Sequence, residues 1–239
     1  MIHTSPAIAL KNISQHYANG IPVLRHVSLA VAQGSFSVLI GPSGCGKSTI
    51  LKLLTGIEKE TSGTLTIAGE TSMVFQNGAL FPWLTVYENV AFGISAENAH
   101  RDVVKRETEK YIELMGLSAF THKYPRELSG GQRQRVGIAR ALAIDPAIIL
   151  LDEPFSALDP KTTEELHAEL LRIWELTKKT ILMVSHSIEE AVLLGDTVSL
   201  MKEGKIVQTF DITLPRARSM DSKKFLEHVT EIRTAFFNK

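Results

Sequence analysis

The sequence predicts an α/β protein with a parallel sheet and crossover helices, and two observations carry that prediction. First, the apolar run FSVLI at 36–40 has the length of a strand and leads through the glycine-rich segment 41–49 into apolar residues at helical spacing. Second, strand-like runs at 147–154, 180–186 and 196–202 alternate with helical segments. This alternation is typical of a sheet whose parallel strands are joined by helices.

Two other regions have a different character. AIALKNISQHY at 7–17 and HVSLAVA at 26–32 alternate apolar and polar residues, as half-buried antiparallel strands do, and strand character continues at 64–69 and 72–76. The stretch from about Leu84 to Leu142 is mostly helical in pattern. We therefore expect an antiparallel β subdomain before the glycine-rich segment and an inserted helical subdomain after it.

Composition limits the kind of partner and compartment. Lys and Arg number 26 and Asp and Glu number 26, so the formal net charge of zero gives no sign of nucleic acid or of an anionic membrane surface as a partner. The single cysteine, Cys45, excludes an internal disulfide and suits a reducing compartment. The start MIHTSPAIAL lacks the features of a signal peptide, and the longest apolar runs are too short to cross a bilayer. We expect a cytosolic chain whose membrane role, if it has one, is peripheral.

The segment GPSGCGKST contains the pattern G-x-x-x-x-G-K-[ST], with Gly41, Gly46, Lys47 and Ser48 in the required places. In a strand-to-helix turn, backbone N–H groups point into one concavity at a helix N-terminus, where a polyanion is favoured. Lys47 would reach the β- and γ-phosphates, Ser48 would offer its hydroxyl to Mg²⁺, and the glycines, Gly44 included, keep side chains away. The plainer alternative is a glycine-rich turn with a solvated lysine. We predict a P-loop NTPase core of the RecA-like type.

Two adjacent carboxylates, Asp152 and Glu153, end the buried strand IILLDEP. Ligands bind at the carboxyl ends of strands in such sheets, and alternation makes the two side chains face different ways. Asp152 can then hold a water on Mg²⁺ while Glu153 points toward the γ-phosphate and an attacking water. The alternative is a strand-end turn with two solvated acids.

The stretch LSGGQ at 128–132 precedes the helical run RQRVGIARAL. Ser129 and Gln132 form a capping box, which by itself marks only a helix start worth about 1 kcal/mol. Gly130 and Gly131 are poor residues for a first helical turn unless a group such as a second phosphate must approach the backbone closely. In its order and spacing with the two motifs above, this set resembles the nucleotide-binding subunit of an ATP-binding cassette (ABC) transporter.

The resemblance covers nearly the whole chain and assigns roles to residues. It implies that Tyr17 stacks on adenine, that Gln76 contacts Mg²⁺ and links the core to the helical region, and that His186 contacts the γ-phosphate. The family often has Asp after this histidine, whereas here Ser187 is expected to form a capping box with Glu190.

The complete set of expected site residues follows. ATP binding involves Tyr17, Gly41, Pro42, Ser43, Gly44, Cys45, Gly46, Lys47, Ser48, Thr49 and Gln76; catalysis involves Glu153, His186 and Lys47; the metal ligands are Ser48, Gln76 and Asp152; the signature motif acting on the opposite subunit is Ser129, Gly130, Gly131 and Gln132; and the dimer-interface loop is Ser156, Ala157, Leu158 and Asp159. Cys45 is expected to be a small filler, with a thiol pKa lowered by the helix N-terminus and Lys47.

In domain terms, the resemblance implies one cassette over 1–239. Its α/β core and β subdomain comprise 1–76 and 144–210, the helical signature subdomain comprises 77–143, and a tail helix lies in 211–239. Asp159 and Pro160 are expected to start a helix that runs to about Leu176.

The resemblance also implies partners. The family implies a dimer with two composite ATP sites, bound to two membrane permease subunits. Leu80, Phe81, Pro82 and Trp83 form an apolar cluster of the sort that receives a short helix from a membrane subunit, although they could instead pack the helical insertion.

The tail narrows the type of transporter. The stretch at 211–237, DITLPRARSMDSKKFLEHVTEIRTAFF, resembles the LPRPR-like segment and final helix of nitrate, taurine and alkanesulfonate import ATPases, with Ala217 where a second proline is frequent. We therefore expect an ATPase with ATP and Mg²⁺ as cofactors, peripheral on the cytoplasmic face of the membrane, that drives import of a small solute delivered by an extracytoplasmic binding protein. The alternatives are an exporter or lipid-transport ATPase and, from another class, a soluble cassette acting on DNA or ribosomes.

Overall fold

The computed structural model describes residues 5–17, 20–96 and 100–238. The chain forms two compact units, the first from residues 1–71 and 178–239 and the second from residues 72–177. The α/β class and the antiparallel β subdomain expected from the sequence are both confirmed.

The first unit contains a three-stranded antiparallel sheet of order β2-β1-β4, formed by β1 (Ile8–His16), β2 (Pro22–Val31) and β4 (Ser62–Ile67). β2 begins earlier than the alternation at 26–32 predicts. The register with β1 is irregular near His26, whose φ of 53° is left-handed. This bulge breaks the period of two, so the sequence pattern marked only the regular part of the strand.

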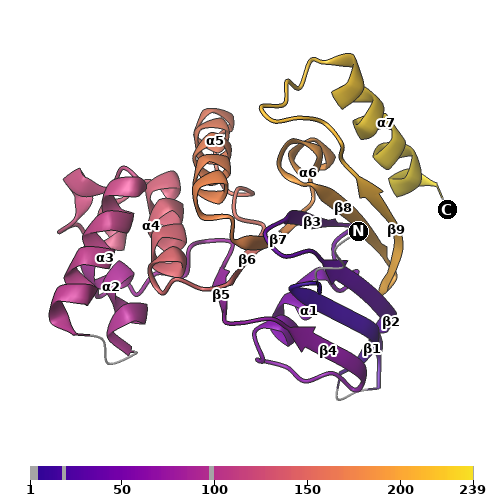
Figure 1. Ribbon diagram of the computed structural model, residues 1–239, viewed down its shortest axis with the longest axis horizontal. Coiled ribbons are helices and arrows are strands. Elements are labelled where there is room, and N and C mark those ends of the chain that lie inside the picture. The colour runs from indigo at the N-terminus through magenta and orange to yellow at the C-terminus, as the bar shows by residue number, and fades with distance from the viewer. Residues whose placement is uncertain (1–4, 18–19, 97–99, 239) are drawn as a thin grey trace. The chain divides into compact units, whose positions relative to one another are not determined.

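The other sheet of the first unit has the strand order β7-β3-β8-β9 (Figure 1). β3 (Phe36–Ile40) pairs in parallel with β7 (Thr180–Ser185) and with β8 (Thr197–Lys202), and every β3 residue is buried. The connecting helices are α1 (Lys47–Leu54) and α6 (Ile188–Leu194). Because β3 is central, the loop that follows it is fixed on both sides.

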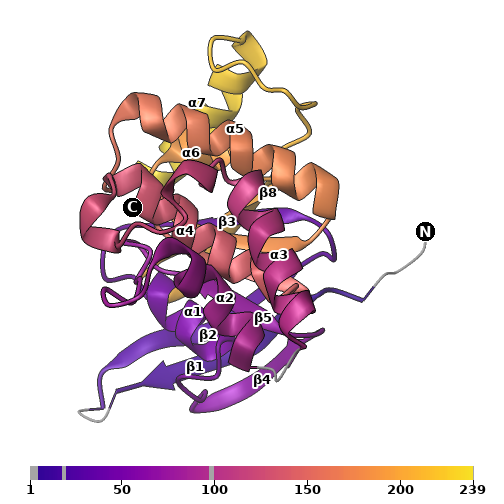
Figure 2. The same ribbon diagram turned by 90° about the vertical axis from the view of Figure 1, so that its left-hand side faces the viewer.

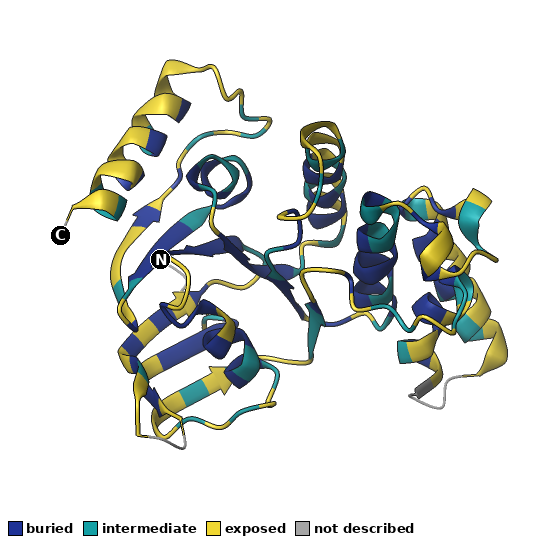
Figure 3. Cartoon of the chain, turned by 180° about the vertical axis from the view of Figure 1, so that it is seen from behind, coloured by how far each residue is buried: buried dark blue, intermediate teal, exposed yellow. Residues whose placement is uncertain are grey.

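One strand was not expected from the sequence. β9 (Lys205–Asp211) returns antiparallel to β8 through a tight turn at Glu203 and Gly204, both with positive φ. Two such residues between alternating runs are the signature of a two-residue hairpin. After β9 the chain reaches α7 (Lys223–Phe237), which buries Phe225, Val229 and Ile232 on one face and exposes the other (Figure 3).

The second unit is mostly helical. α2 (Val86–Ala96), α3 (Arg101–Leu114) and α4 (Gly130–Ala143) pack against one another (Figure 2). Two short 3₁₀ turns, Ser118–Phe120 and Pro125–Glu127, connect α3 to α4. The unit also includes β5 (Thr71–Val74), which pairs with β6 (Ile148–Asp152), and α5 (Pro160–Thr177). It is therefore larger than the helical segment 77–143.

Asn89 organises the loop before α2. Its side chain is fully buried; its carbonyl accepts from the N–H of Phe81 at 2.9 Å, and its amide nitrogen lies within 2.9–3.2 Å of the carbonyls of Phe81, Leu84 and Thr85. When a side chain that makes such bonds is removed, each buried partner that is left without a hydrogen bond destabilises the fold by its full desolvation penalty. Asn89 therefore fixes the shape of the segment that carries Phe81 and Trp83.

Asn89→Ala should lower the free energy of unfolding by about 2 kcal/mol, because Phe81, Leu84 and Thr85 keep their buried backbone groups and lose the amide. Urea unfolding followed by circular dichroism measures this. Asn77→Ala, at an exposed position of the same unit, is the matched control and should change the stability by less than about 0.5 kcal/mol. Equal midpoints for the two variants would contradict the role given to Asn89.

Candidate functional site

The glycine-rich segment lies between β3 and α1, as expected for a phosphate loop. A side chain at Gly41 would lie 2.2 Å from the carbonyl oxygen of Met201, and Gly46 has a φ of 110° that only glycine adopts without strain. The glycines at these two places are therefore required by the fold. They let the backbone turn sharply into the N-terminus of α1, where N–H groups without helical partners favour an anion.

Lys47 turns back into this loop. Its side chain is only 6% exposed, and its ammonium donates to the carbonyls of Gly41 at 2.7 Å and Pro42 at 3.1 Å. The loop thus holds a buried positive charge among backbone groups. A phosphate in the concavity would meet that charge directly.

Cys45 is also buried in the loop, with 5% of its surface exposed. Burial raises the pKa of its thiol, and the charge of Lys47 and local backbone N–H groups oppose this without overcoming it. The expectation of a lowered pKa was therefore wrong. Desolvation outweighs the helix terminus because the thiol points into the protein.

Tyr17 directly follows β1, and its side chain lies beside the first turn of α1. Its hydroxyl and the hydroxyl of Thr49 are 3.3 Å apart, and the ring is 42% exposed. An exposed aromatic face beside a phosphate loop is placed to stack on a base. The structure therefore brings Tyr17 to the loop, although its sequence position is 24 residues before Gly41.

His186 reaches the same edge from another strand. Ile40 of β3 pairs with Ser185 of β7, so Gly41 and His186 both leave the sheet one residue beyond a paired position. Parallel strands present their carboxyl ends on one side, which is where such sheets bind ligands. The exposed His186 therefore leaves the same edge of the sheet as the phosphate loop, next to it. The two are far apart in the sequence, so the sequence alone does not show that they are neighbours.

Hydrogen bonds shape the residues after His186. Ser187 caps α6 by accepting from the N–H of Glu190 at 3.1 Å, which is the first half of the expected capping box. The Glu190 carboxylate accepts from the hydroxyl of Ser185, whose oxygen accepts from the N–H of Ser187 at 3.0 Å. This network ties the end of β7 to the first turn of α6 and involves Ser185, which sequence reasoning did not single out.

In the second unit, Asp152 ends β6 and Glu153 follows it with a φ of 46°. A left-handed conformation at a residue other than glycine, asparagine or aspartate is uncommon and often marks a functional position. The hydroxyl of Ser156 donates to the Glu153 carbonyl at 3.0 Å and accepts from the Gln76 amide at 2.9 Å. Gln76 is therefore connected to the turn that carries Glu153.

The segment 128–132 folds as its capping box predicts. Ser129 accepts from the N–H of Gln132 at 3.2 Å, and Gln132 accepts from the N–H of Ser129 at 2.9 Å. A side chain at Gly131 would lie 2.4 Å from Cγ2 of Thr162, whereas one at Gly130 would meet the side chains of Leu158 at 3.4 Å and Arg133 at 4.0 Å, both ordinary contact distances. Packing against α5 therefore explains Gly131. Gly130 has no such intramolecular reason.

The loop before α5 carries Ser156 and Ala157, both exposed, and the half-buried Leu158. Asp159 caps α5: its carboxylate accepts from the hydroxyl of Thr162 at 2.6 Å and from its N–H at 3.1 Å. These bonds, the hydroxyl one first, lower the pKa of the Asp159 carboxyl. The cap fixes where the exposed part of the loop ends.

The apolar cluster at 80–83 is only partly packed. Phe81 stacks on Phe92 with ring centroids 4.5 Å apart and is 5.6 Å from the ring of Trp83, and Arg140 lies over its face. Trp83 is 69% exposed and Phe92 is 49% exposed. Phe81 is therefore half-buried against the helical unit, whereas Trp83 is mostly exposed.

The two units divide the expected site residues. The first carries Tyr17, the phosphate loop with Pro42, Ser43, Ser48 and Thr49, and His186. The second carries Gln76, Asp152, Glu153, the segment 129–132 and the loop 156–159. Within the described residues, none of the helices combines the length and the apolar character needed to span a membrane.

Comparison with known proteins identifies the family of the chain. Residues 24–156 match the family model of the ABC transporters. The chain is 40% identical to the aliphatic sulfonates import ATP-binding protein of Bacillus cereus, over 92% of each chain. It is also 40% identical to the nitrate import ATP-binding protein of Synechococcus elongatus, over 88% of this chain and 82% of that one.

A solved structure matches most of the chain. It is a dimeric ATP-binding cassette in a post-hydrolysis state bound to ADP and Pi, with a TM-score of 0.79 and 32% identity over 87% of this chain and 100% of that one. Together with the phosphate loop that ends β3 and the acids that end β6, these matches show that the chain belongs to the ABC transporter family, as one of its ATP-binding subunits.

Proposed function

We propose that this protein is the ATP-hydrolysing subunit of an importer and that it energises the uptake of a small anionic or zwitterionic solute. The observation that carries the ATPase is the phosphate loop, in which backbone N–H groups and the buried ammonium of Lys47 share one concavity. Two relatives are named for the import of aliphatic sulfonates and of nitrate, which supports import and a small oxyanion-like solute.

The residues proposed for Mg²⁺ suit that ion. Ser48, Gln76 and Asp152 offer a hydroxyl, an amide and a carboxylate, and Mg²⁺ prefers such oxygen donors in small numbers alongside phosphate oxygens. The Gln76 amide nitrogen donates to Ser156, so its oxygen is the end that a cation would contact. Bound there with nucleotide, the ion would neutralise charge on the phosphates.

Hydrolysis in this proposal depends on Glu153. Its carboxylate accepts a proton from the attacking water and orients that water, while Lys47 and His186 hold the γ-phosphate. The turn that fixes Glu153 is held by Ser156, which also binds Gln76. The residue that senses the metal and the residue that activates water are thereby mechanically connected.

The ATP sites are proposed to be shared between two copies. Ser129 and Gly130 lie at the start of α4, where Gly130 leaves the backbone open to an approaching phosphate. The family relative in the ADP-bound state is a dimer. In the proposed dimer the segment 129–132 of one copy closes on the nucleotide held by the other, and the loop 156–159 crosses the interface.

The membrane partner is proposed to bind at Trp83. This side chain is mostly exposed beside an aromatic pair whose inner member, Phe81, is anchored by Asn89. Tryptophan is enriched among the few residues that carry most of the binding energy of a protein interface. The complete system would place the protein on the cytoplasmic face of the membrane, with two permease subunits and an extracytoplasmic solute-binding protein.

The thiol of Cys45 tests the phosphate loop. A bulky maleimide should block ATP hydrolysis, and MgATP should slow the reaction by covering the loop. Because burial raises the pKa of the thiol, the reactive thiolate is scarce at neutral pH, and the labelling rate should rise about tenfold per pH unit from pH 7 to 9. Full ATPase activity after complete labelling, measured by mass spectrometry, would contradict this placement.

Glu153→Gln keeps the size and hydrogen bonding of the side chain but cannot accept a proton. Hydrolysis should fall by roughly 10²-fold or more while MgATP still binds. The trapped nucleotide should hold two copies together, so the variant should run as a dimer on gel filtration with MgATP and as a monomer with MgADP.

Two further variants sharpen this test. Glu203→Gln, the same change at another left-handed glutamate, should keep wild-type hydrolysis. Adding Ser129→Arg to Glu153→Gln should abolish the dimer, because the cation would occupy the space of the opposite nucleotide. Wild-type turnover by Glu153→Gln would remove Glu153 from the mechanism.

Trp83→Ala should leave the affinity for ATP unchanged within about twofold and weaken capture of the permease from detergent extracts by tenfold or more. The exposed Leu176→Ala is a matched control on the same unit and should capture the permease normally. Equal capture by the Trp83 variant and the wild type would place the interface elsewhere.

A further inference from the structure

The short helix α6 begins two residues after His186, and the tail beyond β9 contacts both of its ends. α6 has seven residues, about two turns, and helices of this length are not stable alone. Its direction, and with it the position of the loop that carries His186, therefore depends on what packs around it. α7 packs directly against α6 (Figure 1).

Arg218 binds the C-terminal end of α6. Its guanidinium donates to the carbonyls of Val192 at 2.6 Å, Leu193 at 3.2 Å and Gly195 at 2.6 Å. It also donates to the carbonyls of two tail residues, Ile212 and Leu214, at 3.3 and 3.2 Å. Burial, with the nearby Arg216, lowers its pKa to about 10, so it remains charged at neutral pH. A cation at a helix C-terminus stabilises the last carbonyls.

Arg216 fixes the same stretch of tail to the sheet. It pairs with Asp196 at 2.6 Å, and the second oxygen of Asp196 accepts from the N–H of Phe36 at 2.9 Å. Phe36 is the first residue of β3. The tail is therefore anchored to the strand that leads into the phosphate loop as well as to α6.

Arg233 binds the other end of α6. From α7 it forms an ion pair with Glu189, which lies in the first turn of α6, three residues after His186. Both side chains are about half exposed. With Arg218 at one end and Arg233 at the other, the tail holds α6 lengthwise.

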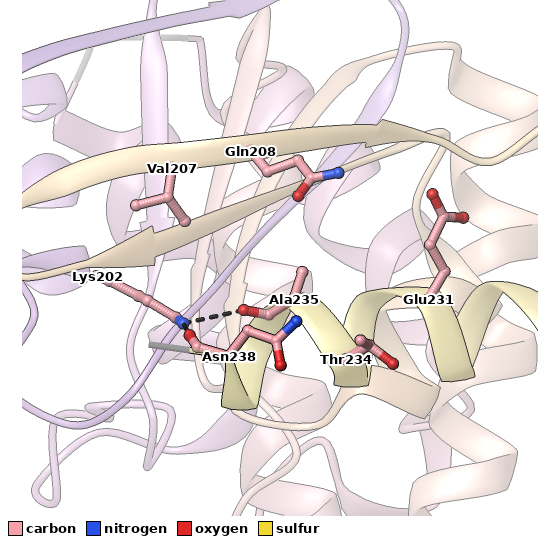
Figure 4. Close-up of a pocket in the computed structure, with 7 residues that line it drawn as sticks. All are labelled: Lys202, Val207, Gln208, Glu231, Thr234, Ala235 and Asn238. Carbon is pink, nitrogen blue, oxygen red and sulfur yellow. Dashed lines mark hydrogen bonds between the residues drawn. The ribbon is translucent and has the colours of Figure 1, made fainter.

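The C-terminal end of α7 is attached to β8, the strand that lies against the start of the phosphate loop. Lys202, the last residue of β8, donates to the carbonyls of Ala235 at 2.9 Å and Asn238 at 2.5 Å, where α7 ends (Figure 4). The preceding residue, Met201, is the one whose carbonyl lies against Gly41. The tail is thus attached to β8 through Lys202 and, through Arg218 and Arg233, to α6, which follows β7. β7 and β8 are the two strands that flank β3.

We propose that the tail segment 212–238 is a brace that sets the position of His186 for ATP hydrolysis, with Arg218 and Arg233 as its positioning residues. The inference rests on the proposed contact of His186 with the γ-phosphate. The arginines act through α6 and do not touch nucleotide. Loosening either end of α6 lets the His186 loop move, which slows the hydrolysis step and leaves nucleotide binding at Tyr17 and the phosphate loop intact.

The test reverses one charge and then restores the pair. Arg233→Glu in the full chain faces Glu189 with a like charge, and kcat for ATP should fall about three- to fivefold with KM unchanged within twofold. Glu189→Arg combined with Arg233→Glu should return kcat to near the wild-type value. Lys223→Glu reverses a charge on the same helix, where Lys223 pairs only within α7 to Glu227 as far as the described contacts show, and should leave kcat unchanged.

Hydrogen exchange provides a readout independent of turnover. Backbone amides of residues 186–195 should exchange several-fold faster in Arg233→Glu and in Arg218→Gln than in the wild type, while amides of α1 are unaffected. Unchanged kcat and unchanged exchange in Arg233→Glu would overturn the brace, as would an equal loss of kcat in Lys223→Glu or a failure of the reversed pair to restore it.

The variant His186→Ala distinguishes the proposed role of His186 in hydrolysis from the proposed role of the tail in positioning it. If it abolishes hydrolysis while Arg233→Glu retains wild-type kcat, the brace is wrong and the role of His186 stands. If His186→Ala hydrolyses ATP at the wild-type rate, the proposed role of His186 is wrong, and so is the proposal that the tail affects hydrolysis by positioning His186.

Discussion

The structure of the first unit depends on the close approach of the backbone at Gly41 to the carbonyl of Met201. A side chain at this position would lie 2.2 Å from that oxygen, so only glycine allows the chain to leave β3 at this point and turn into α1. The parallel register of β3 with β7 and β8 fixes both strands on which that contact depends. The same register places His186 one residue beyond the partner of Ile40. The anion site and the γ-phosphate contact proposed for His186 therefore follow from one set of backbone pairings.

Most of the fold was predictable because its helices and strands carry local sequence signals. β3, β6 and β7 are continuous apolar runs, and Ser129 and Asp159 cap their helices as their side chains and positions predict. The strand β9 was missed because its residues alternate weakly and its evidence lies in the turn at Glu203 and Gly204. The pKa of Cys45 was predicted in the wrong direction because burial of a loop residue is a tertiary property.

The connections between the candidate site residues could not be predicted from the sequence. The family resemblance implies a role for Gln76, and the end of the strand 147–154 suggests one for Glu153, but nothing in the sequence indicates that Ser156 joins them through its hydroxyl. In the same way, Gly131 reads as a phosphate contact until Thr162 is found against it. The bond from Gln76 to Ser156 and the contact of Gly131 with Thr162 join residues 80 and 31 positions apart, and they depend on how elements pack and not on local pattern.

The path of the chain explains how events at a partner surface could reach the chemistry. Gln76 and Trp83 are seven residues apart on one segment, and that segment is held at intervals along its length. Gln76 is bound to Ser156, the carbonyl of Gly78 accepts from Arg140 at 2.8 Å, and Phe81 is fixed by Asn89 and lies under the same Arg140. The segment that carries the exposed Trp83 is therefore joined by hydrogen bonds to the rest of the unit at Gln76, Gly78 and Phe81, and Gln76 is joined through Ser156 to the turn that carries Glu153. A partner that binds at Trp83, as proposed, would contact the same segment that holds Gln76.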